Sequence, residues 1–167
     1  MATAYKLISS STVGGGGATD ITFSSIPATY TDLIIKGSFR GTGTGSPNTM
    51  LDINGVSTNR TMKWVQGNGG AVSSYNFTTA DIGTANTTTQ TANTFCSFEI
   101  YLFNYSSASN KCFGVESVQE SNTGTVYVDL LAGLWSNTAV ITSLKVYING
   151  QNLGQYSTAY LYGISNA

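Results

Sequence analysis

The sequence predicts an all-β protein, built as an antiparallel sandwich of two packed sheets with about nine to ten strands. Two observations lead to this prediction. Short runs rich in β-branched and aromatic residues recur along the chain, separated by clusters of Gly, Asn, Ser and Thr. No long stretch places apolar residues at the spacing of a helix face. The 167 residues suit one unit, so we expect a single sandwich domain over residues 1–167.

The N-terminal half alternates strand-like runs with turn signals. A flexible stretch at Gly14–Gly17 follows the first run and is interpreted as a hinge or a crossover between strands. Asn54-Gly55 is a favoured type I′ dipeptide and predicts a hairpin between the fourth and fifth runs. The expected strands are Ala4–Ser10, Asp20–Ser25, Asp32–Arg40, Met50–Ile53 and Arg60–Gln66.

The segment from Gly67 to Thr94 is rich in Gly, Thr and Asn and is interpreted as a long surface excursion with one or two weak strands, around Tyr75–Thr78. The C-terminal half is more regular, and Asn149-Gly150 gives a second type I′ signal. Phe95–Asn104 is apolar on both faces, which predicts an interior strand covered on both sides. The strands expected here are Phe95–Asn104, Lys111–Gln119, Thr125–Trp135, Ile141–Ile148 and Ser157–Ile164.

Charge and composition exclude several classes of function. Seven basic and eight acidic residues give a net charge of −1, with no basic run of the kind that binds nucleic acid. The absence of histidine removes the commonest acid–base group and the usual zinc ligands, so we expect no enzyme activity, no metal and no cofactor. Glu99 and Glu116 lie on adjacent expected strands and could approach each other, but no motif surrounds them.

No apolar run is long enough to span a membrane, and the N-terminus lacks the apolar stretch of a signal peptide. We therefore expect synthesis in a cytoplasm. If the loop at residues 105–110 closes a tight hairpin, Cys96 and Cys112 do not lie opposite each other and cannot form a disulfide. They are predicted to be free, buried and apolar in behaviour.

The two tryptophans, Trp64 and Trp135, allow two interpretations. Both suit core packing. Alternatively, exposed rings could stack on sugars, with Tyr75, Tyr105 and Tyr156 as further candidates.

Three segments together resemble the small virion structural proteins of tailed bacteriophages, including decoration-type proteins of aquatic and cyanobacterial phages. The resemblance covers most of the chain and is weakest from Thr42 to Asn93. The segments are Ala4–Ile8, Phe23–Leu33, and Ala132–Ile141 continuing through Tyr156–Ala159 and Leu161–Ile164.

The resemblance implies a jelly-roll-like sandwich and a structural role in the virion, after synthesis in the cytoplasm of the host bacterium. The first expectation is a capsid decoration or cement protein, a homotrimer whose partner is the major capsid protein. Residues 1–17 are a candidate arm, with Tyr5, Leu7 and Ile8 as contacts, although an ordinary edge strand fits equally well. The alternative is a tail-tip or tail-fibre adhesin that binds host surface polysaccharide through Trp64 and Tyr75.

Overall fold

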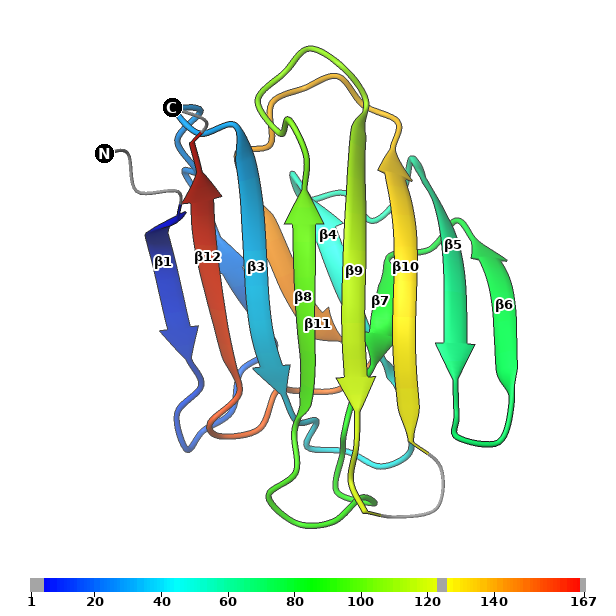
Figure 1. Ribbon diagram of the computed structural model, residues 1–167. Coiled ribbons are helices and arrows are strands. Elements are labelled where there is room, and N and C mark those ends of the chain that lie inside the picture. Colours follow the sequence, from blue (N-terminus) through cyan, green and yellow to red (C-terminus); the bar gives the residue numbers. More distant parts are fainter. Residues whose placement is uncertain (1–4, 123–125, 166–167) are drawn as a thin grey trace.

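The computed structural model describes residues 5–122 and 126–165, and the described chain forms twelve strands in two antiparallel sheets (Figure 1). The all-β sandwich is therefore confirmed, with a few strands more than expected. None of the described residues forms a helix capable of crossing a membrane. The strands are β1 (Tyr5–Thr12), β2 (Asp20–Phe23), β3 (Asp32–Phe39), β4 (Asn48–Ile53), β5 (Arg60–Gly67), β6 (Val72–Phe77), β7 (Asp81–Thr84), β8 (Cys96–Leu102), β9 (Lys111–Gln119), β10 (Tyr127–Trp135), β11 (Leu144–Ile148) and β12 (Thr158–Ile164).

The large sheet has eight strands in the order β1-β12-β3-β8-β9-β10-β5-β6, and the small sheet has four in the order β2-β11-β4-β7. The chain passes repeatedly from one sheet to the other, since β2, β4, β7 and β11 all belong to the small sheet. These crossovers join the two sheets of the sandwich through the chain itself. Gly14–Gly17 lies in the first crossover, between β1 and β2, as predicted.

Period-two alternation puts one row of the inner large-sheet strands into the core, whereas the edge strands β1 and β6 are mostly exposed. In β8 and β9, buried and more exposed residues alternate along the whole strand. The facing rows of the two sheets meet between them, for example Leu33 and Ile35 from β3 with Leu51 from β4 and Val146 from β11. This close-packed layer holds the two sheets together.

Two glycines of the large sheet make room for aromatic rings. Gly37 pairs with Phe98, and Gly133 pairs with Phe113, in both cases across neighbouring strands. A Cβ at Gly37 would lie 2.1 Å from the Phe98 ring, and a Cβ at Gly133 would lie 2.2 Å from the Phe113 ring. Each ring therefore fills the place of the missing side chain on the core side of the sheet.

The predicted type I′ turn at Asn54-Gly55 has the expected left-handed backbone, with φ of 52° and 75°. The type I′ turn predicted at Asn149-Gly150 is wrong, because only the glycine of this pair has a positive φ, of 68°. The predicted hairpin across the first turn is also wrong. β4 pairs with β11 and β7, whereas β5 pairs with β10 and β6 in the other sheet. Left-handed Asn59 precedes β5 at the point where the chain changes sheets.

The segment at residues 67–94 is a surface excursion only in part: the strand expected near Tyr75–Thr78 is present as the exposed β6, but the middle of the segment is buried. It supplies β6 at the edge of the large sheet and β7 in the small sheet, and residues 80–87 are all buried. Arg40 holds the following loop, since its guanidinium donates hydrogen bonds to the carbonyl oxygens of Thr91 and Thr94 at 2.9 and 2.7 Å. The Thr and Asn residues that suggested a loop serve here as hydrogen-bonding groups.

The expectation that residues 95–104 are covered on both sides is wrong. β8 is interior to the large sheet, between β3 and β9, but only the row of Cys96, Phe98, Ile100 and Leu102 is buried. The small sheet covers that side alone. No described strand covers the opposite side of the large sheet, and this side is the first candidate for an interaction surface.

Candidate functional site

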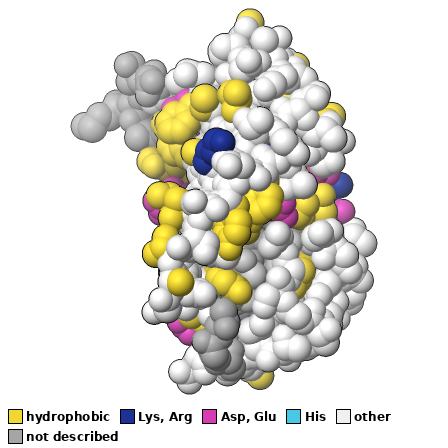
Figure 2. Space-filling view, turned by 90° about the vertical axis from the view of Figure 1, so that its right-hand side faces the viewer, with side chains coloured by type: hydrophobic (Ala, Val, Ile, Leu, Met, Phe, Trp, Pro, Cys, Tyr) yellow, Lys and Arg dark blue, Asp and Glu magenta, His cyan; other side chains and the backbone are white. Residues whose placement is uncertain are grey.

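The open side of the large sheet carries a group of exposed apolar side chains. Cross-strand pairing places them next to one another: Val128 lies opposite Val118, Leu130 lies opposite Val65, and Val72 lies opposite Gly67. We call this group the outer apolar face. It comprises Val65, Val72, Phe103, Val118, Val128 and Leu130, from β5, β6, β9, β10 and the end of β8. Figure 2, which views the molecule from its β5–β6 side, shows hydrophobic side chains gathered among polar atoms.

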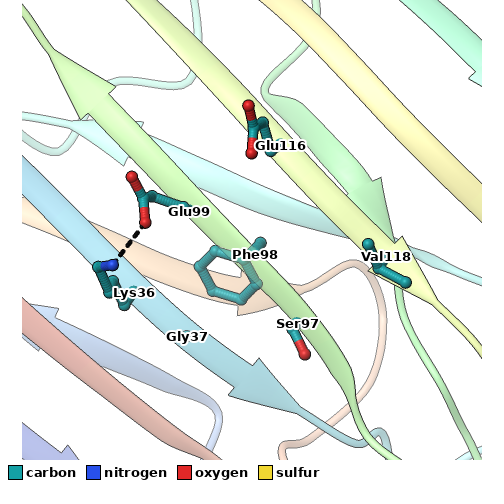
Figure 3. A pocket seen from close by; sticks show the side chains of 7 residues that line it. All are labelled: Lys36, Gly37, Ser97, Phe98, Glu99, Glu116 and Val118. Carbon is teal, nitrogen blue, oxygen red and sulfur yellow. Dashed lines mark ion pairs between the residues drawn. The ribbon is translucent and has the colours of Figure 1, made fainter.

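Two shallow hollows indent the same side of the sheet. One of about 310 Å³ is lined by Lys36, Ser97, Phe98, Glu99, Glu116 and Val118, together with Gly37 (Figure 3). The other, of about 260 Å³, shares Glu99 and Glu116 and lies over Gly114, where a Cβ would meet no atom within 4 Å. The missing side chain at Gly114 therefore leaves space that a protruding group of a partner can fill.

Charges on this side are few and unevenly paired. Lys36 Nζ lies 2.7 Å from Glu99 Oε2, and this contact raises the pKa of Lys36 through hydrogen bonding and charge attraction. Glu116 stands directly opposite Glu99 across β8 and β9. No side chain neutralises Glu116 within the described residues, so it is free to meet a cationic group of a partner.

The sequence candidates Tyr5, Leu7 and Ile8 lie on β1, an edge strand that pairs with β12. Tyr5 and Leu7 are about half exposed, at 51% and 50%. Leu7 pairs with Tyr162, so it shares the open side of the large sheet. Ile8 packs against the core instead. The described part of segment 1–17 is thus an edge strand with two residues available for contact, and residues 1–4 lie outside the described residues.

A third hollow lies between the two sheets, next to the β5–β6 hairpin. Strand β7, the near edge of the small sheet, packs against β9 and β10, so β5 and β6 extend beyond it. The resulting cleft has a volume of about 210 Å³. It is lined by Trp64, Gln66, Tyr75, Phe77 and Tyr127 from the large sheet, and by Ser46, Asn48 and Thr84 from the β4–β7 side. We call it the aromatic cleft.

The rings of the aromatic cleft pack against one another. Trp64 meets Tyr75 and Phe77 edge-to-face, with centroids 6.2 and 5.5 Å apart, and Tyr75 stacks on Phe77 at 5.7 Å. Trp64 is only 4% exposed, so the prediction that it presents a face to a sugar is wrong, and its core-packing interpretation is confirmed together with that of Trp135. Tyr75 is 41% exposed and keeps an accessible ring.

A buried carboxylate lies behind the cleft wall. Asp129 is 2% exposed, and its Oδ1 accepts hydrogen bonds from Trp64 Nε1 and Gln66 Nε2, each at 2.9 Å. Its Oδ2 is buried and has no hydrogen-bond partner among the described residues. Burial raises the pKa of Asp129, while the bonds from Gln66 and Trp64 act in the opposite direction. Asp129 therefore fixes the orientation of two cleft-lining side chains.

The structure also places the remaining titratable candidates. Glu99 and Glu116 are brought together, but side by side on one sheet face rather than across a cleft. Among the described residues no three His, Cys, Asp or Glu side chains form a potential metal site. Cys96 and Cys112 are both free, as predicted. Cys96 is buried, which raises its pKa to about 11, whereas Cys112 is exposed, contrary to the prediction.

Sequence reasoning missed the outer apolar face and Asp129. A signal for the first was present in Tyr127–Trp135, where Val128 and Leu130 alternate with the core residue Leu131 and make both rows of the strand apolar. The signal for Asp129 was a single acidic residue inside that apolar strand, since an isolated buried carboxylate needs donors around it.

Comparison with known proteins identifies no relative: no family model, no curated protein and no solved structure matches the chain.

Proposed function

We propose that this protein is a structural component of a bacteriophage virion, a capsid decoration or cement protein that binds and stabilises the shell. The observation that carries the proposal is the outer apolar face, which the fold leaves uncovered over five neighbouring strand segments. Large exposed apolar patches on a folded protein are typical of interaction surfaces. The resemblance of three segments to phage virion proteins indicates the proposed partner, the major capsid protein.

The contact would depend on shape and apolar burial more than on charge. The open side carries only a few charged residues, among them the Lys36–Glu99 pair and Glu116. A capsid surface that fits it presents apolar side chains to the outer apolar face, a protrusion into the hollow over Gly114, and a cationic group opposite Glu116. Binding of this kind changes little with ionic strength.

The proposal includes a homotrimer at the three-fold positions of the shell. A cyclic trimer needs two different surfaces on each copy that fit one another. The large sheet offers two different edges, β1 with exposed Tyr5 and Leu7, and β6 with exposed Val72 and Tyr75. Each edge strand has a free row of backbone N–H and C=O groups. Equilibrium sedimentation of the purified chain tests this part, and a monomer at micromolar concentration would contradict it.

Gold-labelled antibody against this chain, viewed on intact virions by electron microscopy, tests the proposed location. We expect label over the whole head. Label confined to the tail or its tip would contradict the decoration role and support the alternative, a tail adhesin for host polysaccharide. An absence of label from particles that demonstrably contain the gene product by mass spectrometry would place the protein inside the shell and overturn both.

A further inference from the structure

The aromatic cleft has the features of a small-ligand site, and it lies apart from the outer apolar face. Its wall faces inward, toward the space between the sheets, where Trp64 pairs with Tyr75 across β5 and β6. The outer apolar face occupies the opposite row of the same strands, as the pairing of Leu130 with Val65 shows. A ligand in the cleft and a partner on the outer face would therefore touch different side chains.

Two amide side chains of the cleft, Gln66 and Asn48, keep an oxygen that can accept a hydrogen bond. Gln66 donates through Nε2 to Asp129, which leaves its carbonyl oxygen Oε1 directed elsewhere. Asn48 donates through Nδ2 to Asp81 Oδ1 at 2.8 Å, which likewise leaves Oδ1 available. Because an amide nitrogen must face each carboxylate, the orientation of both amides is determined by chemistry. Two residues that line the cleft thus have their amide groups fixed, with carbonyl oxygens left to accept hydrogen bonds from a ligand.

The charge and shape of the cleft restrict the ligand further. None of the eight lining residues is acidic or basic. The volume of about 210 Å³ is below the range of roughly 300–1,000 Å³ that suits drug-sized ligands. A fitting ligand is accordingly small and uncharged, with hydroxyl donors for the two amide oxygens and an apolar face for the Tyr75 ring.

We propose that the aromatic cleft binds one neutral sugar ring, with its C–H face on Tyr75 and its hydroxyl groups donating to Gln66 and Asn48. A neutral sugar has both an apolar face of ring hydrogens and several hydroxyl donors, so it satisfies each requirement at once. Asp129 acts as a positioning residue, since it orients Gln66 and the indole of Trp64 without lining the cleft itself. This inference does not depend on the decoration role.

The experiment uses the purified full chain on a printed array of neutral and anionic glycans. NMR titration follows, with the methyl glycosides of glucose, galactose, mannose and N-acetylglucosamine. We expect binding to at least one neutral glycan and chemical-shift changes at residues of the cleft. No binding by the folded protein, binding to anionic glycans alone, or shift changes confined to other surfaces would overturn the inference.

Variants locate the site. Tyr75→Ala removes the stacking ring and should weaken binding at least tenfold, whereas Tyr75→Phe keeps the ring and should stay within about threefold of the unmodified protein. Tyr160→Ala removes a comparably exposed tyrosine near the opposite edge of the sheet and serves as the matched control. Unchanged binding by Tyr75→Ala would contradict the proposed stacking.

A second variant covers the case in which Tyr75→Ala does not fold. Gln66→Met keeps the length of the side chain but removes the amide oxygen, and we expect it to bind at least tenfold more weakly. Binding equal to that of the unmodified protein would contradict the role of Gln66. Because these tests need no phage particle, failure of sugar binding and failure of the decoration role are separate results.

Discussion

Weakening the outer apolar face without altering the core should weaken attachment to the shell. The perturbation is the triple variant Val65→Thr, Val128→Thr and Leu130→Thr, which affects three adjacent side chains of β5 and β10. Threonine favours strands as valine does, and all three positions point away from the core, so the fold should persist. The triple variant therefore separates binding from stability.

The magnitude follows from the exposed fractions of the three side chains, which are 47%, 61% and 58%. Complete burial of a valine or leucine contributes about 1.5–3 kcal/mol, so covering the exposed half of each contributes roughly 1 kcal/mol, or about 3 kcal/mol together. Threonine retains a methyl group, which leaves an expected loss of about 2 kcal/mol. At about 1.4 kcal/mol for each tenfold change in Kd, binding should be roughly thirtyfold weaker.

The assay is cosedimentation of the purified protein with capsids assembled without it, over a range of protein concentrations. Tyr156→Asn is the matched control, because Tyr156 is an exposed apolar residue in a loop, and asparagine tolerates its φ of 70°. A triple variant that keeps its melting temperature and binds capsids within threefold of the unmodified protein would refute the reasoning.

Three further predictions concern the interior. Gly133→Ala should destabilise the protein by about 1–3 kcal/mol in thermal unfolding, because its Cβ would collide with a core ring; Gly114→Ala, in open space, should cost nothing. Asp129→Asn should remove a pH dependence of the free energy of unfolding. Burial raises the pKa of Asp129 above 3.8, so the folded state binds the proton more tightly and loses stability as pH rises from about 4 through that raised pKa. Urea unfolding at several pH values tests this, and parallel curves for both proteins would contradict it. Exposed Cys112 should react with a thiol reagent in the folded protein, and buried Cys96 only on unfolding; simultaneous reaction of both would show that the core opens.

Local patterns were sufficient for most of the strands. The run Lys111–Gln119 was predicted with the bounds of β9, because its alternation is strong and turn residues flank it. The hairpin that joins β8 to β9 also leaves the two cysteines out of register, as expected, since Ser97 pairs with Val118 and Leu102 with Phe113. The alternation of apolar and polar residues within a strand, and the turn residues that flank it, can both be recognised in the local sequence.

Tertiary context decided what the sequence left open. β7 is short, with the sequence Asp-Ile-Gly-Thr, and its composition suggests a turn, yet β4 and the core make it a buried strand. The partner of β4 was mistaken because a turn dipeptide specifies the turn and not the sheet in which the next strand lies. The outer row of β8 combines Tyr101 with the polar residues Ser97 and Glu99, and none of the described strands covers it.

The pairing of β1 with β12 has a consequence for biosynthesis. β1 joins the large sheet only through β12, the described strand that is synthesised after all the others. Until β12 has been made, Tyr5 and Leu7 remain on a nascent strand without its ladder partner, and β3 lacks one of its two ladders. Contacts between residues so distant in sequence form slowly. Closure of this edge therefore waits for β12, and a chain that stops before residue 158 leaves two strand edges free to pair with other molecules.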